Sequence, residues 1–146
     1  DKLIMAPKLQ RRKARELALK AVYALAISES EPGDIRDNLI RDETLAPRHV
    51  EYARALFFRV QEETPWAEEV IEKLAENWKL ERIARIDRCI LQLALVELKT
   101  MPDVPENVVM NEAIELAKKY STGESAAFVN GILDRFVKTM LERPTQ

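Results

Sequence analysis

Glycine is so scarce in this chain that it restricts the fold to architectures with few tight turns. Only three of the 146 residues are glycine, at positions 33, 123 and 131. In addition, no segment shows a sustained alternation of apolar and polar residues between turn residues, which is the pattern of a half-buried strand. The sequence therefore predicts an all-α fold.

Apolar residues recur instead at three- and four-residue spacings, which place them on one face of a helix. The pattern predicts seven helices: over residues 11–27, 80–98 and 105–120, from Asp34, from about Pro47, from Thr64-Pro65, and along a stripe from Phe128 to Leu141. The helix over 80–98 is apolar on nearly all sides in its second half, so we expect it to be central. Short loops between helices predict a compact bundle. We expect one domain over residues 1–146 with two packed helical subdomains, over about 11–63 and about 64–142.

One glycine interrupts the apolar stripe of the last helix. Gly131 stands among apolar residues at helical spacing, where glycine costs about 1 kcal/mol relative to alanine. Such a cost indicates that the position requires a small residue. We therefore expect another helix to cross close to Gly131.

The residues that most catalytic and cofactor sites need are scarce. Three glycines cannot build a dinucleotide-binding loop or a P-loop, and one histidine with one cysteine cannot form a Cys/His zinc cluster. Cys89 and His49 could formally pair as nucleophile and base. However, Cys89 lies in a strongly apolar stretch and His49 in the first turn of another predicted helix, so we interpret them as a buried thiol and a surface imidazole. No catalytic residue, metal or cofactor is predicted, and we expect that the protein is not an enzyme.

The overall charge and hydropathy restrict the partners and the location of the protein. A net charge of −2 argues against binding nucleic acid through global charge, so any such site must be local. No stretch approaches the roughly 20 apolar residues of a membrane span, and the apolar run near the start is too short for a signal peptide. The single cysteine cannot form an internal disulfide. We expect a cytoplasmic protein without a membrane partner.

Positive charge is concentrated at the start of the first predicted helix. Residues 8–15, KLQRRKAR, contain five cations and no acid. Cations oppose the helix dipole there, whereas a phosphate would benefit from arginine forks and from the first-turn N–H groups. Tyr23 lies on a stripe leading from this segment, where its ring can stack on an unpaired base. The pattern predicts a site for RNA or DNA. If about four cations contact single-stranded RNA, the slope of log affinity against log salt is near −3. A solvated helix end and a half-buried tyrosine would produce the same pattern.

Several motifs resemble the NusB family of transcription antitermination factors. They are RRKARE at 11–16 with AVY at 21–23, ILQLALVEL at 90–98, DVP at 103–105, NEAIELAK at 111–118 and FVNGILD at 128–134. The resemblance spans nearly the whole chain, and the last two motifs are specific at their spacing. It implies a seven-helix fold without enzymatic activity, and a heterodimer with ribosomal protein S10, also called NusE. That pair binds the boxA element of RNA and helps to load an antitermination complex onto RNA polymerase.

The resemblance also implies roles for individual residues. The residues that match the family's RNA-contacting first helix are Arg11, Arg12, Lys13, Arg15 and Tyr23. A second RNA-contacting region matches the loop and helix start from Glu124 to Phe128, where this sequence departs from the family in having Ala126 and Ala127 in place of polar or basic residues. Glu81 and Asp87 match acidic positions at which members of the family contact NusE.

Two other interpretations fit the sequence. A similar helical RNA-binding domain occurs at the N-terminus of some RNA cytosine methyltransferases, and a helical protein-interaction module could carry an incidental basic end. Because the chain has no cofactor loop and no catalytic cysteine motif, we expect a free-standing adaptor. An apolar helix face can close a core or a self-interface equally well, so the sequence is compatible with both a monomer and a homodimer.

Overall fold

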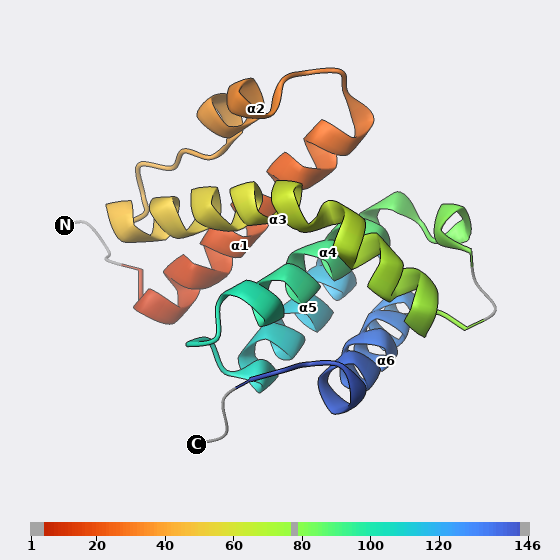
Figure 1. Cartoon of the computed structure of the whole chain (residues 1–146). Helices are drawn as coiled ribbons and strands as arrows, with labels where there is room; N and C mark the ends of the chain where they lie inside the picture. The colour runs from red at the N-terminus through yellow and green to blue at the C-terminus, as the bar shows by residue number, and fades with distance from the viewer. Residues whose placement is uncertain (1–4, 77–78, 144–146) are drawn as a thin grey trace. The chain divides into compact units, whose positions relative to one another are not determined.

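Six α-helices and one 3-10 turn form the regular structure of residues 5–76 and 79–143, the part of the chain that the computed structural model describes. The helices are α1 (Pro7–Ile27), α2 (Pro32–Leu39), α3 (Pro47–Leu74), α4 (Arg85–Thr100), α5 (Glu106–Tyr120) and α6 (Gly123–Thr139), and the turn η1 (Leu80–Arg82) precedes α4 (Figure 1). Those two ranges contain no strand. The predicted all-α fold is confirmed, whereas the predicted count of seven helices is wrong.

The difference in helix count arises at Thr64-Pro65, where the sequence predicted a new helix. Helix α3 continues through Pro65 to Leu74. Proline inside a helix lacks the N–H for the carbonyl four residues earlier and costs about 3 kcal/mol. Just beyond it, Ala67, Val70 and Ile71 are buried. Because packing of an apolar face supplies most helix stability in proteins, their burial offsets the local cost.

Three predicted helix starts differ from the observed ones. Helix α1 begins at Pro7 rather than at residue 11, and α2 begins at Pro32 rather than after Asp34. Both helices have proline at a first-turn position, where the fixed φ angle favours helix and the missing N–H costs nothing. The central helix begins at Arg85 rather than at residue 80, because the backbone is extended at Ile83 after the η1 turn.

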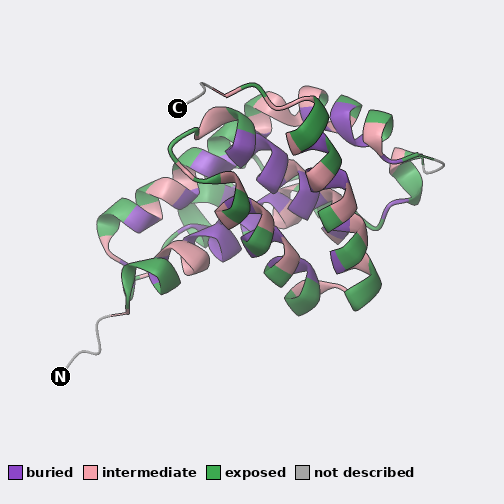
Figure 2. Ribbon diagram, turned by 90° about the horizontal axis from the view of Figure 1, so that it is seen from below, coloured by how far each residue is buried: buried purple, intermediate pink, exposed green. Residues whose placement is uncertain are grey.

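The chain divides into two compact units, one ending at Phe58 and the other starting at Arg59. The first unit contains α1, α2 and the first part of α3, and α1 packs against α2 in it. Its buried apolar residues are Ala14, Leu17, Ala18, Leu19, Ala21, Val22, Ile35, Ile40, Leu45, Ala53, Leu56 and Phe57. Figure 2 shows that the helices alternate buried positions with exposed ones, as amphipathic helices do.

In the second unit, α4 contacts both α5 and α6, and α5 contacts α6. Every residue of α4 from Cys89 to Leu98 except Gln92 is buried. The apolar second half of α4 therefore accounts for its packing against two neighbouring helices. Within the described ranges, no helix has both the length and the apolar character needed to cross a membrane.

The close helix crossing predicted at Gly131 is wrong. A Cβ atom at this position would meet only Nη2 of Arg135 on the same helix, at 3.6 Å, which is an ordinary contact. Among residues 5–76 and 79–143, no atom of a neighbouring helix lies within 4 Å of that position. Gly131 is half-buried in α6, and nothing in the structure requires a glycine there.

Candidate nucleic-acid interface

The basic segment forms the first two turns of α1. Its N-cap residue, Ala6, makes no side-chain capping bond, and the first turn contains no acidic residue. Backbone N–H groups at such a helix start have no intrahelical partner. Lys8 is exposed, and Arg11, Arg12 and Lys13 are half-buried. The start of α1 thus combines side-chain cations with the positive end of the helix dipole.

Gln10 joins the start of α1 to the start of α3. This side chain is 6% exposed. Its Nε2 donates to the carbonyl of Met5 at 2.7 Å, and its Oε1 accepts from the backbone N–H of Ala46 at 2.8 Å. Both ends of the amide are therefore satisfied, as a buried polar group requires. The bond to Met5 is local to the start of α1, and the bond to Ala46 joins the first turn of α1 to the residue before α3 (Figure 1).

This arrangement places Arg11 against two residues of α3. The Cζ atom of Arg11 lies 3.6 Å from the centre of the Tyr52 ring, within the range of a cation–π interaction. Its Nε donates to Nδ1 of His49 at 3.1 Å. One face and one nitrogen of the guanidinium are thus engaged inside the first unit. The Nη1–Nη2 edge is the part that can form a forked pair with a phosphate.

His49 is 3% exposed, so the prediction of a surface imidazole is wrong. Burial lowers the pKa of His49 below its usual 6.5, and the charges of Arg11 and Arg48 lower it further. A neutral imidazole has only one acceptor nitrogen. Arg48 Nε also lies 3.3 Å from Nε2 of His49, so only one of the two arginine contacts can be a hydrogen bond at a time. The contact with Arg11 is the shorter of the two. We therefore take Nδ1 of His49 as the acceptor nitrogen and Arg11 as the donor.

The remaining residues predicted on α1 differ in accessibility. Arg15 is 4% exposed, and its Cζ lies 5.8 Å from the centre of the Tyr52 ring. It therefore lies behind Arg11 rather than on the surface. Tyr23 is half-buried and follows Arg12 by eleven residues, which is about three helical turns and about 16 Å of rise. Tyr23 thus lies on the same side of α1 as Arg12.

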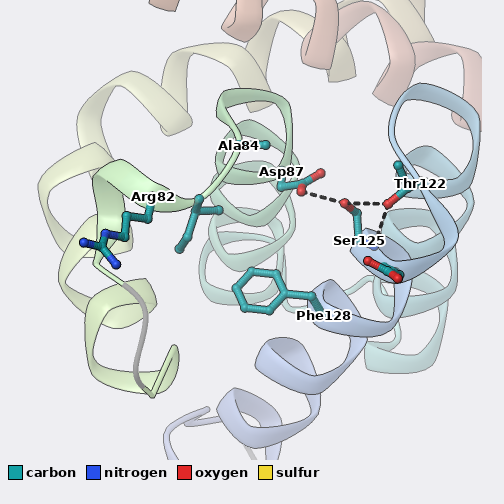
Figure 3. Close-up of a pocket in the computed structure, with 8 residues that line it drawn as sticks. Arg82, Ala84, Asp87, Thr122, Ser125 and Phe128 are labelled. Carbon is teal, nitrogen blue, oxygen red and sulfur yellow. Dashed lines mark hydrogen bonds between the residues drawn. The ribbon is translucent and has the colours of Figure 1, made fainter.

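The other predicted site residues belong to the second unit, where three of them line one pocket. The pocket has a volume of about 260 Å³ (Figure 3). Its lining residues are Arg82, Ile83, Ala84, Asp87, Thr122, Glu124, Ser125 and Phe128. Asp87, which the family resemblance assigned to a protein partner, therefore lies with Glu124 and Phe128, which the resemblance assigned to RNA. Glu81 is exposed in the η1 turn.

A hydrogen-bond network connects α4 to the start of α6 at this pocket. Thr122 is the N-cap of α6, and its Oγ1 accepts from the Ser125 N–H at 3.0 Å. Oγ of Ser125 donates to Oδ2 of Asp87 at 2.7 Å, and Oγ of Ser121 donates to Oγ of Ser125 at 2.9 Å. Asp87 is only 6% exposed, and its Oδ1 has no hydrogen-bond partner in the described part of the chain. Its carboxylate is therefore a buried connection between two helices.

The sequence interpretation missed Gln10, His49 and Tyr52 as parts of the site. Arg11 and His49 are separated by 38 residues, and no periodic pattern relates positions that far apart. The only signal in the sequence was the presence of a polar amide, Gln10, within the basic segment.

Comparisons with known proteins extend these observations. The model of the NusB family matches residues 12–138. The transcription antitermination protein NusB of Myxococcus xanthus is 41% identical over 142 residues, which cover 92% of this chain and 98% of that protein. A solved structure of NusB from T. maritima has a TM-score of 0.84 at 34% identity, over 90% of this chain and 93% of that one. A chain from a complex of antitermination factors NusB and NusE with double-stranded RNA has a TM-score of 0.78, over 88% of this chain and 96% of that one. Because the sequence identity to that chain is 24%, this match shows a shared fold and no more.

The helices therefore have the fold of the NusB-type helical proteins. The family match covers most of the described residues, and the identity to curated relatives extends over nearly their whole length. This chain belongs to the NusB family, and the resemblance seen in its motifs is confirmed.

Proposed function

We propose that this protein is an RNA-binding adaptor of transcription antitermination, which binds boxA-type single-stranded RNA together with NusE. The observation that carries the proposal is the cluster of cations at a helix start without a side-chain cap, in a chain of the NusB family. In the proposed setting, the protein acts in the cytoplasm and contributes to an antitermination complex on RNA polymerase.

The proposed RNA contacts on α1 divide into phosphate binding and base stacking. Arg11, Arg12 and Lys13 supply the phosphate contacts, which provide affinity without sequence information. Tyr23 offers a ring for stacking on an unpaired base, as is usual in recognition of single-stranded RNA. Because Arg15 is buried, it supports the surface from behind and contributes its charge at a distance.

The pocket of the second unit contributes a different kind of contact. Phe128 is half-buried at its wall and can present a ring face to a base. Glu124 is exposed and would repel a phosphate, but its carboxylate can accept a hydrogen bond from the amino group of a base. We therefore assign base recognition to this region, rather than phosphate binding.

NusE is a ribosomal protein and is expected to be basic. The exposed Glu81 is suited to steer such a partner, mainly through the rate of association. Asp87 is buried and bonded to Ser125, so we propose that it contributes by holding the start of α6 in place. The two acidic residues thus differ in role.

We propose binding without catalysis. Burial raises the pKa of the Cys89 thiol to about 11, and a thiol with that pKa is not a nucleophile at neutral pH. This chain is similar to an antitermination protein over 98% of that protein's length. This similarity favours the adaptor over a domain of a methyltransferase.

The proposal is tested by titrating a fluorescent boxA ribo-oligonucleotide with the protein, with and without NusE. A variant with Arg11→Gln, Arg12→Gln and Lys13→Gln should lose about tenfold or more in affinity. The matched control carries Lys73→Gln, Lys118→Gln and Lys138→Gln, which removes the same charge from exposed positions of the second unit. Equal losses in the two variants would show that only net charge matters, and undiminished binding by the first would reject the interface.

A further inference from the structure

Arg11 is held more firmly than a surface arginine usually is. Its guanidinium is stacked on Tyr52, and its Nε donates to Nδ1 of the buried His49. Both of these residues belong to α3, and Gln10 joins the start of α1 to the start of α3 by accepting a hydrogen bond from the backbone N–H of Ala46. Arg11 is therefore confined by a second helix before any ligand arrives.

Such confinement matters because arginine has a long side chain with many rotamers. Binding a phosphate normally requires most of that freedom to be lost, which weakens the affinity. A guanidinium whose face and Nε are already engaged keeps its planar Nη1–Nη2 fork in one direction, and less entropy is lost when the fork pairs with a phosphate. Arg11 therefore offers a prepared phosphate contact at the start of α1, beside the cations of Arg12 and Lys13.

We propose that Tyr52 and His49 are positioning residues of the RNA interface, which hold the guanidinium of Arg11 ready to pair with a phosphate. The inference rests on the proposed function and adds α3 to a site that the sequence placed on α1 and the start of α6 alone. Neither residue carries charge in this role, since His49 accepts the bond from Arg11 as a neutral imidazole. Of the cations that contact them, Arg11 lies closest, since Arg15 is 5.8 Å from the Tyr52 ring and Arg48 is 3.3 Å from Nε2 of His49.

A double-mutant cycle tests whether Tyr52 acts through Arg11. The affinity for a fluorescent boxA ribo-oligonucleotide is measured for the wild type, Tyr52→Leu, Arg11→Gln and the double variant. Removing the stack should weaken binding about 2- to 5-fold, from the usual strength of an exposed cation–π interaction. In the Arg11→Gln background the same Tyr52→Leu change should have almost no effect. Tyr52→Phe retains the ring and should bind as the wild type does.

His49 provides a second, independent variant in case Tyr52→Leu does not fold. His49→Asn retains an acceptor near the position of Nδ1 and should keep the affinity, whereas His49→Leu removes the acceptor and should weaken binding. Arg11→Lys keeps the charge but cannot form the fork, so it should also weaken binding. Circular dichroism and thermal melting of each variant identify those that are folded.

The outcomes separate this inference from the proposed function. If the wild type does not bind the boxA oligonucleotide with or without NusE, the proposed function itself fails. If the wild type binds, and a folded Tyr52→Leu or His49→Leu variant binds equally well, the positioning role is rejected. It is also rejected if the Tyr52→Leu penalty persists in full in the Arg11→Gln background, because the tyrosine would then act without Arg11.

Discussion

Ser125→Ala should destabilise the second unit, because it removes a hydroxyl that donates to a buried carboxylate. Oγ of Ser125 donates to Oδ2 of Asp87 at 2.7 Å, and Asp87 is 6% exposed. Its Oδ1 already lacks a partner among the described residues. A hydrogen bond to a charged group contributes about 1.5–3 kcal/mol, and leaving the charged group unsatisfied adds to the loss. We expect Ser125→Ala to lower the free energy of unfolding by about 2–3 kcal/mol.

Urea unfolding followed by tryptophan fluorescence measures this loss. Trp66 is a suitable reporter because it belongs to the same unit and its ring lies 5.8 Å from that of Phe136, edge to face. In thermal melting, the expected loss corresponds to a decrease in Tm of about 6–9 °C for a chain of this size. Ser121→Ala is the control, since that hydroxyl donates to Ser125 rather than to the carboxylate.

Adding Asp87→Asn to Ser125→Ala should recover part of the stability, because a neutral amide is less costly to bury than an unpaired carboxylate. The stabilising role of the Ser125 hydroxyl is rejected if Ser125→Ala unfolds within about 0.5 kcal/mol of the wild type, the range of ordinary surface substitutions.

Three further predictions concern single residues. The pKa of His49 is lowered from 6.5 in the folded protein, so the unfolded chain binds that proton more readily. The contribution of His49 to the free energy of unfolding should therefore be fully present above about pH 6.5 and decrease below it. His49→Asn should flatten this part of the curve of stability against pH. The thiol of Cys89 should react with a disulfide reagent at pH 8 only after unfolding, since burial raises its pKa to about 11; rapid reaction of the native protein would contradict its burial. Gly131→Ala should raise the free energy of unfolding by about 0.5–1 kcal/mol, because the added Cβ would meet only Arg135, at 3.6 Å. If a urea titration shows that the variant is destabilised, the prediction of a close helix crossing at Gly131 would be right after all.

Much of the fold was predictable because helical periodicity is a local property. The apolar run of α4 and the end of α1 at Ile27 followed directly from spacing. The helix start predicted at Thr64-Pro65 failed for the opposite reason. Local propensity favoured a break there, whereas burial of Ala67, Val70 and Ile71 stabilises a continuous α3.

The candidate site was predictable only where it is contiguous in the sequence. Arg11, Arg12 and Lys13 stand next to one another, so their charge was visible as a segment. The contact of Arg11 with His49 and Tyr52 depends on how α1 packs against α3, which spacing within one helix does not reveal. The family resemblance assigned Arg15 to RNA and Asp87 to a protein partner, but both side chains are buried.

The salt dependence of RNA binding is the decisive measurement for the proposal that the start of α1 binds a single-stranded RNA through its phosphates. The affinity of the protein for a boxA ribo-oligonucleotide is measured over a range of salt concentrations, beside the triple Arg11→Gln, Arg12→Gln, Lys13→Gln variant. With Arg15 buried, three contacting cations predict a slope of log affinity against log salt of about −2, at about 0.7 per phosphate. The triple variant should show a slope near zero. Equal slopes for the two folded proteins would rule out phosphate binding by these three side chains.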